Sequence, residues 1–367
     1  MIYMSKYSVY LPSYSVGTDA YADIPYVTRF FGKKAVVIGG KTAMAKSKAA
    51  LEEGVRDSDT EITDFIWYGG DSTHANVDML LANDAVRNAD MIFAVGGGRA
   101  IDTVKCVADK LDKPLFTFPT VASNCAPVTA IAVFYNDDGS FCDYYYPKLA
   151  NHCFINTAVI SDSPEQLLWA GIGDALSKEC EVEFSSRNIN LAHTPLMGRQ
   201  LCRVCTEPLI KYGKDALDSI RTHTPSFALE QVTLDIIVST GIVSNMMTTK
   251  DDYYYNSTLA HCVYYGATVT ENGHKHLHGE IVSLGVLCLL EYDHQEENLK
   301  RIMEFNRSIG LPICFDDIGI SENEFGIMAD KFTRSTEWAH MPQGVTREKY
   351  IEAMKKLNER GRAAKRG

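Results

Sequence analysis

The chain has 367 residues, of which 46% are hydrophobic and 23% charged, an ordinary composition for a globular protein with room for two domains. Its formal net charge of −11 at pH 7 argues against nucleic-acid and anionic-membrane partners, because both favour a basic protein surface.

The beginning of the chain carries no signal-peptide pattern, and the longest clear apolar run, 282–290, is too short to span a bilayer. Ten cysteines are scattered along the sequence rather than arrayed. In a reducing compartment most of them are expected to be small buried hydrophobic residues. We therefore expect a cytoplasmic protein without a membrane partner.

The N-terminal portion alternates strand-like and helix-like segments. The predicted strands are 35–40, 62–68, 91–95 and 114–119, and the helical patterns between them include 43–53 and 77–87. This alternation is typical of a doubly wound, largely parallel sheet. Two further segments, 131–135 and 141–146, bracket Asn136-Asp137-Asp138-Gly139 and predict a β-hairpin.

A glycine-rich junction, Gly96-Gly97-Gly98, follows the predicted strand 91–95 and begins a helix whose apolar residues recur on one face. Glycines at such a junction let the backbone approach a ligand closely, and the start of a helix favours negative charge. The junction therefore predicts a cradle for the phosphates of a nucleotide cofactor. The same glycines also suit simple packing of a strand on a helix, so the motif alone leaves both interpretations open.

The strand signals end near residue 162, and long helical patterns follow to an amphipathic, charged tail at 347–367. We therefore expect an α/β domain over 1–162, which binds the dinucleotide, and an all-α domain over 163–367, which binds metal and substrate.

The helical half contains one aspartate and two histidines that together suit a divalent ion. Asp174 is expected at the start of a helix, and His261 and His278 lie on different segments, 278 − 261 = 17 residues apart. One carboxylate and two imidazoles form an open three-ligand site, with positions left for water or a substrate oxygen. By residue type alone, a helix-capping aspartate and two unrelated histidines explain the pattern as well.

Several motifs, in this order along the chain, resemble the iron-containing alcohol dehydrogenase superfamily in its glycerol dehydrogenase-like branch. They are Gly96-Gly97-Gly98-Arg99 with Asp102-Thr103-Val104-Lys105, then Pro119-Thr120-Val121-Ala122-Ser123, Ala170-Gly171-Ile172-Gly173-Asp174, Ala260-His261 and Leu277-His278-Gly279-Glu280. The resemblance implies a dehydroquinate synthase-like fold with the active site between its two domains. It also implies that Asp174, His261 and His278 are the catalytic metal ligands.

The same resemblance implies NAD or NADP as the cofactor and one divalent metal, zinc in the first place and iron as the alternative. The implied cofactor-binding residues are Gly96, Gly97, Gly98, Asp102, Thr120, Ser123, Thr129, Ile131 and Tyr135.

The predicted strand 35–40 ends at Gly40 and is followed by Lys41. We assign both residues to the cofactor site as well. Relatives that prefer NAD place an aspartate there to hold the ribose hydroxyls. Without that carboxylate nothing repels a 2′-phosphate, and Lys41 could pair with one. An exposed lysine at the start of a helix is the alternative interpretation.

Two departures from glycerol dehydrogenases bear on the substrate. Cys125 stands where those enzymes carry an aspartate that contacts the polyol, and Lys178 stands where strictly iron-dependent relatives place another histidine ligand. Both residues are typical of the hydroxycarboxylate dehydrogenases of the same superfamily. We assign Cys125 and Lys178 to the substrate site.

The sequence is interpreted as a metal-dependent NAD(P) oxidoreductase that interconverts a small, glycerol-like alcohol and its carbonyl form by hydride transfer. A 2-hydroxycarboxylate dehydrogenase is the close alternative, and a carbocycle-forming synthase or a non-catalytic nucleotide-binding protein is less favoured. We expect a homo-oligomer that acts on a small molecule.

Overall fold

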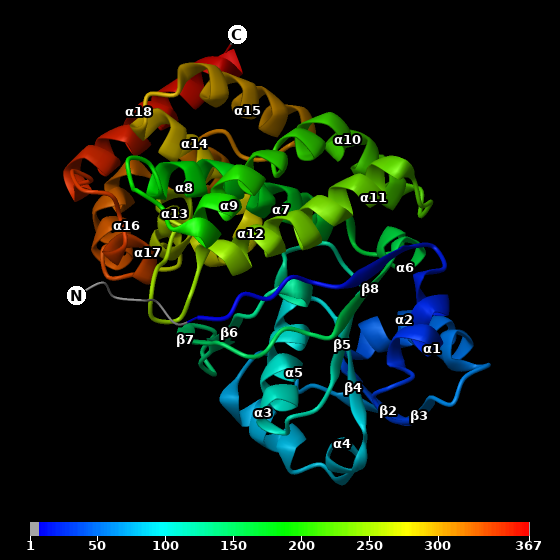
Figure 1. Cartoon of the computed structure of the whole chain (residues 1–367). Helices are drawn as coiled ribbons and strands as arrows, with labels where there is room; N and C mark the ends of the chain where they lie inside the picture. The colour runs from blue at the N-terminus through cyan, green and yellow to red at the C-terminus, as the bar shows by residue number, and fades with distance from the viewer. Residues whose placement is uncertain (1–6, 367) are drawn as a thin grey trace. The chain divides into compact units, whose positions relative to one another are not determined.

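The computed structural model describes residues 7–366 (Figure 1). By their internal contacts these residues divide into two compact units. The sheet unit comprises Ser8–Leu168 and Ala216–Asn245, and the helical unit comprises Trp169–Asp215 and the chain from Met246 onward. The sequence predicted a single division after residue 162. The structure differs because residues 216–245 group with the sheet unit, where Asn245 donates to the carbonyl of Val128 and accepts from the backbone N–H of Ala130.

The sheet unit is built on six parallel strands in the order β1-β8-β5-β4-β2-β3. The strands are β1 Tyr14–Gly17, β2 Lys34–Gly39, β3 Glu61–Trp67, β4 Met91–Gly96, β5 Leu115–Pro119 and β8 His152–Asn156. The four predicted strands are confirmed, whereas β1 and β8 were missed. β1 has only four residues and lies at an edge of the sheet, and neither β1 nor β8 carries the long apolar run that marks the central strands.

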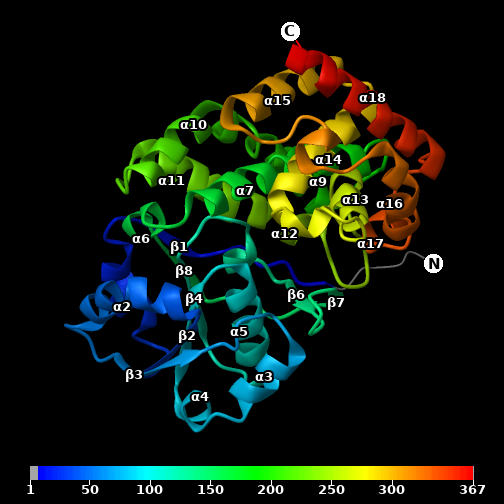
Figure 2. The same cartoon turned by 180° about the vertical axis from the view of Figure 1, so that it is seen from behind.

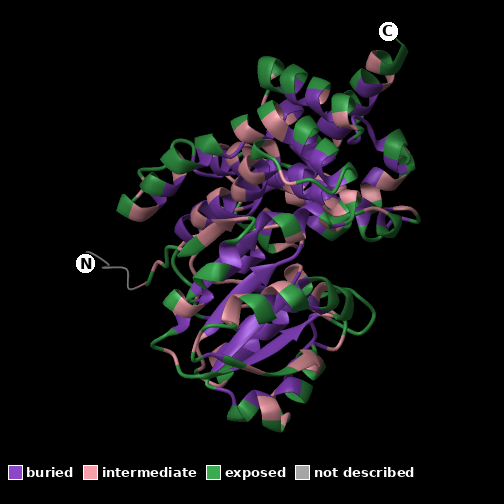
Figure 3. Ribbon diagram, turned by 90° about the vertical axis from the view of Figure 1, so that its right-hand side faces the viewer, coloured by how far each residue is buried: buried purple, intermediate pink, exposed green. Residues whose placement is uncertain are grey.

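Side chains of each central strand alternate between two hydrophobic cores, one on each face of the sheet. Val36 and Ile38 of β2 pack toward α3, His74–Leu81, and α5, Gly98–Lys110. Ala35 and Val37 pack on the other face, toward α1, Ile24–Thr28, and α2, Lys41–Val55. Figure 3 shows the buried strands in purple between these helices. Covered on both faces, the sheet confirms the predicted doubly wound architecture.

Two local predictions in the sheet unit have different outcomes. The hairpin is confirmed as the antiparallel pair β6, Ala132–Tyr135, and β7, Phe141–Tyr145. The helix expected over 77–87 is two helices, because the Asn83 side chain caps a new one, α4, Asp84–Asn88. A short helix α6, Thr157–Ser161, follows β8.

The helical unit is organised around a central helix, α14, whose residues from Ile281 to Glu291 are buried. Helices α13, α15 and α18 pack against it, and α13 and α18 lie beside it in both views (Figures 1 and 2). The principal helices that contribute to this unit are α7 Glu165–Ala175, α8 Ser177–Ser185, α9 His193–Leu201, α10 Glu207–Arg221, α13 Leu259–Ala267, α14 His278–Tyr292, α15 Glu296–Ile309, α16 Phe325–Phe332, α17 Thr336–Ala339 and α18 Arg347–Arg366.

One helical stretch corrects the expectation that no segment is long and apolar enough to cross a membrane. The stretch Phe227–Met247 is long enough and apolar enough to do so, with a mean hydropathy of 1.4. It consists of α11 Phe227–Leu234, a π-helical turn at Asp235–Ser239 and α12 Thr240–Met247. Because 67% of its apolar window is buried inside the fold, the stretch has the character of a core helix, and a single such helix is weak evidence for a membrane span.

Candidate functional site

Three side chains predicted as metal ligands meet in the helical unit. The Nε2 atom of His278 lies 3.2 Å from Oδ1 of Asp174, and Nε2 of His261 lies 3.7 Å from the same oxygen. One ligand atom from each residue lies within 4.8 Å of the other two. Asp174 occupies the last turn of α7 rather than the start of a helix as predicted, while His261 lies on α13 and His278 begins α14.

Glycines next to these residues explain how three helices approach so closely. A Cβ atom on Gly279 would lie 1.8 Å from the carbonyl oxygen of Ala170, and one on Gly173 would lie 2.4 Å from the carbonyl oxygen of Gly279. The backbones of α7 and α14 therefore touch directly beside Asp174 and His278. Gly285 plays the same part between α14 and α13, where its Cβ would lie 2.2 Å from the carbonyl of Ala260.

Glu181 of α8 holds His261 within this cluster and was not identified from the sequence. Its carboxylate is fully buried, accepts the backbone N–H groups of Thr258 and His261 at 2.7 and 3.1 Å, and lies 2.8 Å from Nδ1 of His261. A carboxylate can only accept there, so Nδ1 carries the proton and Nε2 is left for a ligand. The spacing of four and seven residues from Asp174 to Lys178 and Glu181 was the available signal, because an unbroken helix would place all three on one face. In the structure α7 ends at Ala175 and α8 begins at Ser177.

The carboxylates of this cluster are held in the charged form. Burial raises the pKa of Asp174, but His278, His261 and Lys178 outweigh it and leave the pKa below its ordinary value. Burial likewise raises the pKa of Glu181, and His261 with the Thr258 N–H reverses the direction. Burial lowers the pKa of His261, while Glu181 and Asp174 together raise it above its ordinary value. The ionised carboxylate of Asp174 and the two imidazoles therefore form a site that favours a cation.

Two neighbours complete the surroundings. Lys178 is buried and donates to the side-chain oxygen of Asn256 at 2.6 Å and to its carbonyl at 3.3 Å. Its ammonium is therefore fixed by the helical unit and supports the negative charge of Asp174. The ring of Tyr264 meets the imidazole of His278 edge-on, with ring centroids 4.2 Å apart.

The sheet unit presents a second candidate site where the strand order reverses. From β2 the chain crosses to β3 on one side, and from β4 it crosses to β5 on the other, so the neighbouring strands β2 and β4 flank a topological switch point. Helices α2 and α5, which follow these strands, cover opposite faces of the sheet. In open α/β sheets ligands bind outside the carboxyl ends of strands at such a point.

The helix starts at this switch point suit anionic groups. Gly40 and Gly97 are the N-cap residues of α2 and α5, and neither helix has a side-chain cap. The nearby helices α3, α4 and α6 are each capped by a side chain, from Thr73, Asn83 and Asn156. The first N–H groups of α2 and α5 therefore need another acceptor, and phosphate oxygens meet that need.

The three predicted glycines join β4 to α5, as expected from the sequence. Gly96 has φ +145°, which favours glycine, and its carbonyl accepts from the N–H of Thr120 at 3.2 Å. A Cβ on Gly98 would lie 2.5 Å from Nδ2 of Asn124, and one on Gly97 would lie 3.1 Å from Val121. The 120–124 loop, with half-buried Ser123, thus closes over the start of α5.

Asp102 and Thr129 make hydrogen bonds and ion pairs inside the sheet unit. Asp102 is buried, accepts from the N–H of Val133 at 3.1 Å and pairs with Lys105 at 2.8 Å. Lys105 is fully buried and donates to the carbonyls of residues 126, 129 and 131. The Thr129 hydroxyl lies in the same network, and Ile131 contributes its carbonyl. Asp102, Thr129 and Ile131 therefore shape the loop that borders the cradle, with Lys105 as the centre of the network.

The remaining predicted residues lie around the switch point and its loops. Lys41, the first residue of α2, places its ammonium 4.3 Å from the ring centroid of Trp67. The guanidinium of Arg99 lies 4.8 Å from the ring centroid of Tyr135. Cys125 is half-buried and precedes a short 3₁₀ turn, where its carbonyl accepts the N–H of Val128 at 3.1 Å.

Comparisons with known proteins show the family and the fold of this chain. A family model described as iron-containing alcohol dehydrogenase matches residues 12–160. A glycerol dehydrogenase of Thermotoga maritima is 31% identical over 308 residues, which cover 81% of this chain and 82% of that protein. A glycolaldehyde reductase of Halobacterium salinarum is 25% identical over 95% of this chain and 96% of its own length. The crystal structure of a glycerol dehydrogenase from Schizosaccharomyces pombe has a TM-score of 0.86 at 24% identity, over 98% of this chain and 92% of that one.

Proposed function

The chain belongs to the iron-containing alcohol dehydrogenase family, in its glycerol dehydrogenase-like branch, and on this basis we propose how its residues divide the work of the reaction. It is a metal-dependent oxidoreductase that interconverts a small alcohol or polyol and the corresponding carbonyl compound. A nicotinamide cofactor carries the hydride in such reactions, and the protein supplies binding and orientation. The observation that carries the proposal is the convergence of Asp174, His261 and His278 around one point.

The residues present fit a divalent ion. Two imidazole nitrogens and one ionised carboxylate oxygen face one another, and the partner that Glu181 gives to His261 leaves Nε2 in the form that binds a metal. This donor set suits zinc, and iron(II) is the alternative. A bound ion supplies Lewis acidity, which stabilises negative charge on a substrate oxygen.

The chain's own side chains do the rest at this centre. Glu181 fixes the tautomer and orientation of His261, and Asn256 fixes the ammonium of Lys178. Asp174 stays ionised because both imidazoles and Lys178 favour its charged form. In the sheet unit, the uncapped N–H groups at the starts of α2 and α5 hold the cofactor phosphates.

The cofactor preference is proposed from the end of β2. Gly40 occupies the position of the ribose-binding acidic residue, and Lys41 next to it is exposed. We therefore propose that NADP(H) is accepted beside NAD(H), with the ammonium of Lys41 near Trp67 available to a 2′-phosphate. We also propose a cytoplasmic homo-oligomer that has no nucleic-acid or membrane partner. The net charge of −11 supports the absence of nucleic-acid and anionic-membrane partners.

The test is a spectrophotometric panel that follows nicotinamide absorbance with glycerol, 1,2-propanediol, glycolaldehyde, 2-hydroxyacids and 2-oxoacids. We expect turnover with the polyols or the hydroxyaldehyde, loss of turnover after chelation, and recovery when zinc is added. Turnover that survives complete removal of metal would contradict the proposal, as would the absence of any nicotinamide-coupled reaction across the panel. Elemental analysis of the purified protein identifies the resident ion.

A further inference from the structure

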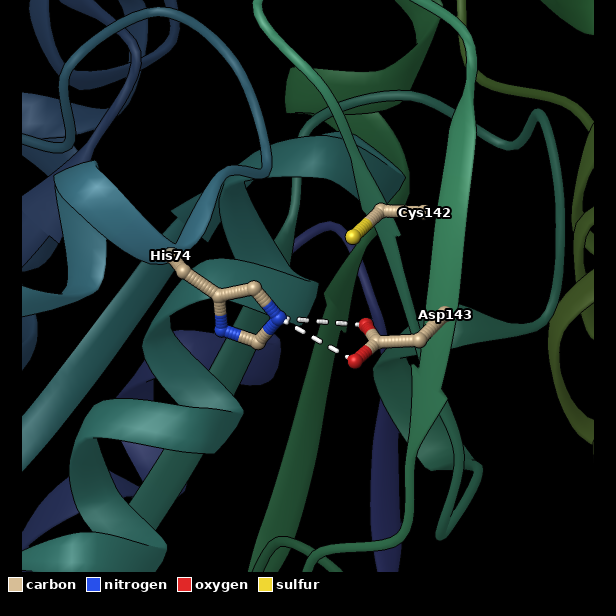
Figure 4. Close-up of side chains that lie close together, drawn as sticks. All are labelled: His74, Cys142 and Asp143. Atoms are coloured by element: carbon tan, nitrogen blue, oxygen red, sulfur yellow. Dashed lines mark hydrogen bonds and ion pairs between the residues drawn. The ribbon is translucent and has the colours of Figure 1, made fainter.

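A second group of metal-binding side chains lies in the sheet unit and includes none of the residues assigned above to the cofactor. His74, Cys142 and Asp143 each offer a ligand atom, and these atoms lie within 4.8 Å of one another. His74 is the first residue of α3, and the other two are consecutive residues of β7 (Figure 4). We refer to these three residues as the hairpin cluster. Among the described cysteines, Cys142 is the exposed one.

A β-bulge brings Cys142 and Asp143 to the same side of the strand. In the pairing of β6 with β7, Phe134 lies opposite Asp143 and Tyr135 lies opposite Phe141, so Cys142 is the extra residue. Consecutive residues of a regular strand point to opposite faces, and a bulge redirects one of them. Figure 4 shows both side chains projecting from β7 toward His74.

His74 is held in place from two directions. Its imidazole stacks on the buried ring of Phe134, with centroids 4.4 Å apart and an interplanar angle of 6°. The segment before α3 is fastened to β6, because the Ser72 hydroxyl donates to the carbonyl of Val133 and the N–H of Tyr135 donates to the carbonyl of Ser72, both at 2.8 Å. The imidazole therefore faces β7 without relying on its contact with Asp143.

The geometry fits a metal ion better than a catalytic triad. Nε2 of His74 lies 3.1 and 3.2 Å from the two oxygens of Asp143, and the thiol of Cys142 approaches the same region (Figure 4). A Cys-His-Asp triad uses one ring nitrogen for the thiol and the other for the carboxylate. For a tetrahedral zinc ion, the nitrogen and oxygen ligands are separated by roughly 3.3 Å, given bond lengths near 2.0–2.1 Å. The observed separation is close to this value.

We propose that the hairpin cluster is a second divalent-metal site, selective for zinc, that ties the β6–β7 hairpin to the start of α3. Imidazole, thiolate and carboxylate together suit zinc, whereas calcium and magnesium take oxygen ligands. Binding converts the Cys142 thiol to a thiolate and releases its proton to solvent. The fourth position is open to water because all three residues are exposed. This site does not depend on the proposed reaction.

Cobalt(II) titration of the purified, full-length protein tests the proposal. The Asp174 cluster has only nitrogen and oxygen donors, so a cobalt–thiolate charge-transfer band in the near ultraviolet reports the hairpin cluster alone. We expect one cobalt per chain in this band, its displacement by zinc, its absence in Cys142→Ser, and at least tenfold weaker binding in His74→Gln. His223→Gln is the matched control, because His223 also pairs with a surface aspartate, Asp162, at 3.3 Å and should leave the band unchanged.

A second readout uses the reactivity of the exposed thiol. Zinc at the hairpin cluster should slow alkylation of Cys142 in the wild type, and this protection should be lost in Asp143→Asn and kept in His223→Gln. A wild-type protein without the charge-transfer band overturns the proposal. So does a band that Cys142→Ser retains, or alkylation of Cys142 at the same rate with and without zinc.

Discussion

The candidate metal centre of the helical unit and the candidate cofactor site of the sheet unit are made of different chemical groups, side chains in one and backbone in the other. The proposed metal centre of the helical unit consists of side chains, which are held by backbone contacts at Gly173, Gly279 and Gly285 and by the buried carboxylate of Glu181. The proposed cofactor cradle of the sheet unit consists mainly of backbone N–H groups at the starts of α2 and α5. A site of side chains can be abolished by one substitution, whereas a site of backbone groups can mainly be tuned.

The largest effect is expected from Gly279→Ala. The new methyl group would lie 1.8 Å from the backbone oxygen of Ala170, and neither backbone can yield without separating α7 from α14. Overpacking of this kind typically costs about 1–3 kcal/mol and more where backbone must move. We expect a clear loss of stability in denaturant unfolding together with loss of turnover. Gly326→Ala is the control, because a Cβ there meets no atom within 4 Å. Equal stability of the two variants would show that the close contact is not required.

Glu181→Gln should weaken the metal centre without removing a ligand. The amide keeps the shape of the side chain but no longer offers a charged acceptor to Nδ1 of His261. Partners of this type typically contribute tenfold to a hundredfold in metal affinity. We expect a loss of that size in zinc affinity, measured by competition with a chelator, and recovery of turnover at high zinc. Unchanged affinity would mean that Glu181 does not orient the ligand.

Gly40→Asp should tune the cradle without damaging it. Gly40 has φ −72° and ψ 143°, and a Cβ there would meet its nearest atoms at 3.8 Å, so an aspartate fits. A carboxylate near a 2′-phosphate repels it, an effect of about 1–2 kcal/mol that corresponds to roughly tenfold in preference. We expect the ratio of kcat/KM for NADP(H) over NAD(H) to fall by that factor. A wild-type enzyme strictly selective for NAD(H), or a ratio unmoved by the substitution, would contradict the argument.

The site made of backbone groups could be predicted from the sequence more directly than the site made of side chains. The cradle was visible locally, because Gly96-Gly97-Gly98 directly joins a buried strand to a helix. Asp174, His261 and His278 were identified through the family resemblance, since three separate helices bring them together. Glu181 was missed because its spacing from Asp174 suggests a shared helical face but does not show that it will be buried beneath a histidine of another helix. The π-helical stretch before α12 and the short strand β1 depend on tertiary packing in the same way.

The last prediction concerns substrate choice and Cys125, which the family resemblance places where glycerol dehydrogenases carry an aspartate. A carboxylate that accepts from polyol hydroxyls contributes about 1.5–3 kcal/mol per hydrogen bond and repels an acidic substrate. We expect Cys125→Asp to raise kcat/KM for glycerol relative to 2-oxoacids, and Cys125→Asn to have a weaker effect because it lacks the charge. If the ratio stays the same in both variants, Cys125 does not determine specificity.

The most direct measurement is the metal content of His278→Ala beside that of Cys142→Ser, determined together with turnover. The two substitutions remove one ligand each from different clusters, the first in the helical unit and the second in the sheet unit. We predict that His278→Ala loses one bound ion together with its turnover, while Cys142→Ser loses only the ion of the hairpin cluster and keeps its turnover. An unchanged tightly bound ion and undiminished turnover in His278→Ala would contradict the assignment of Asp174, His261 and His278 as the metal centre.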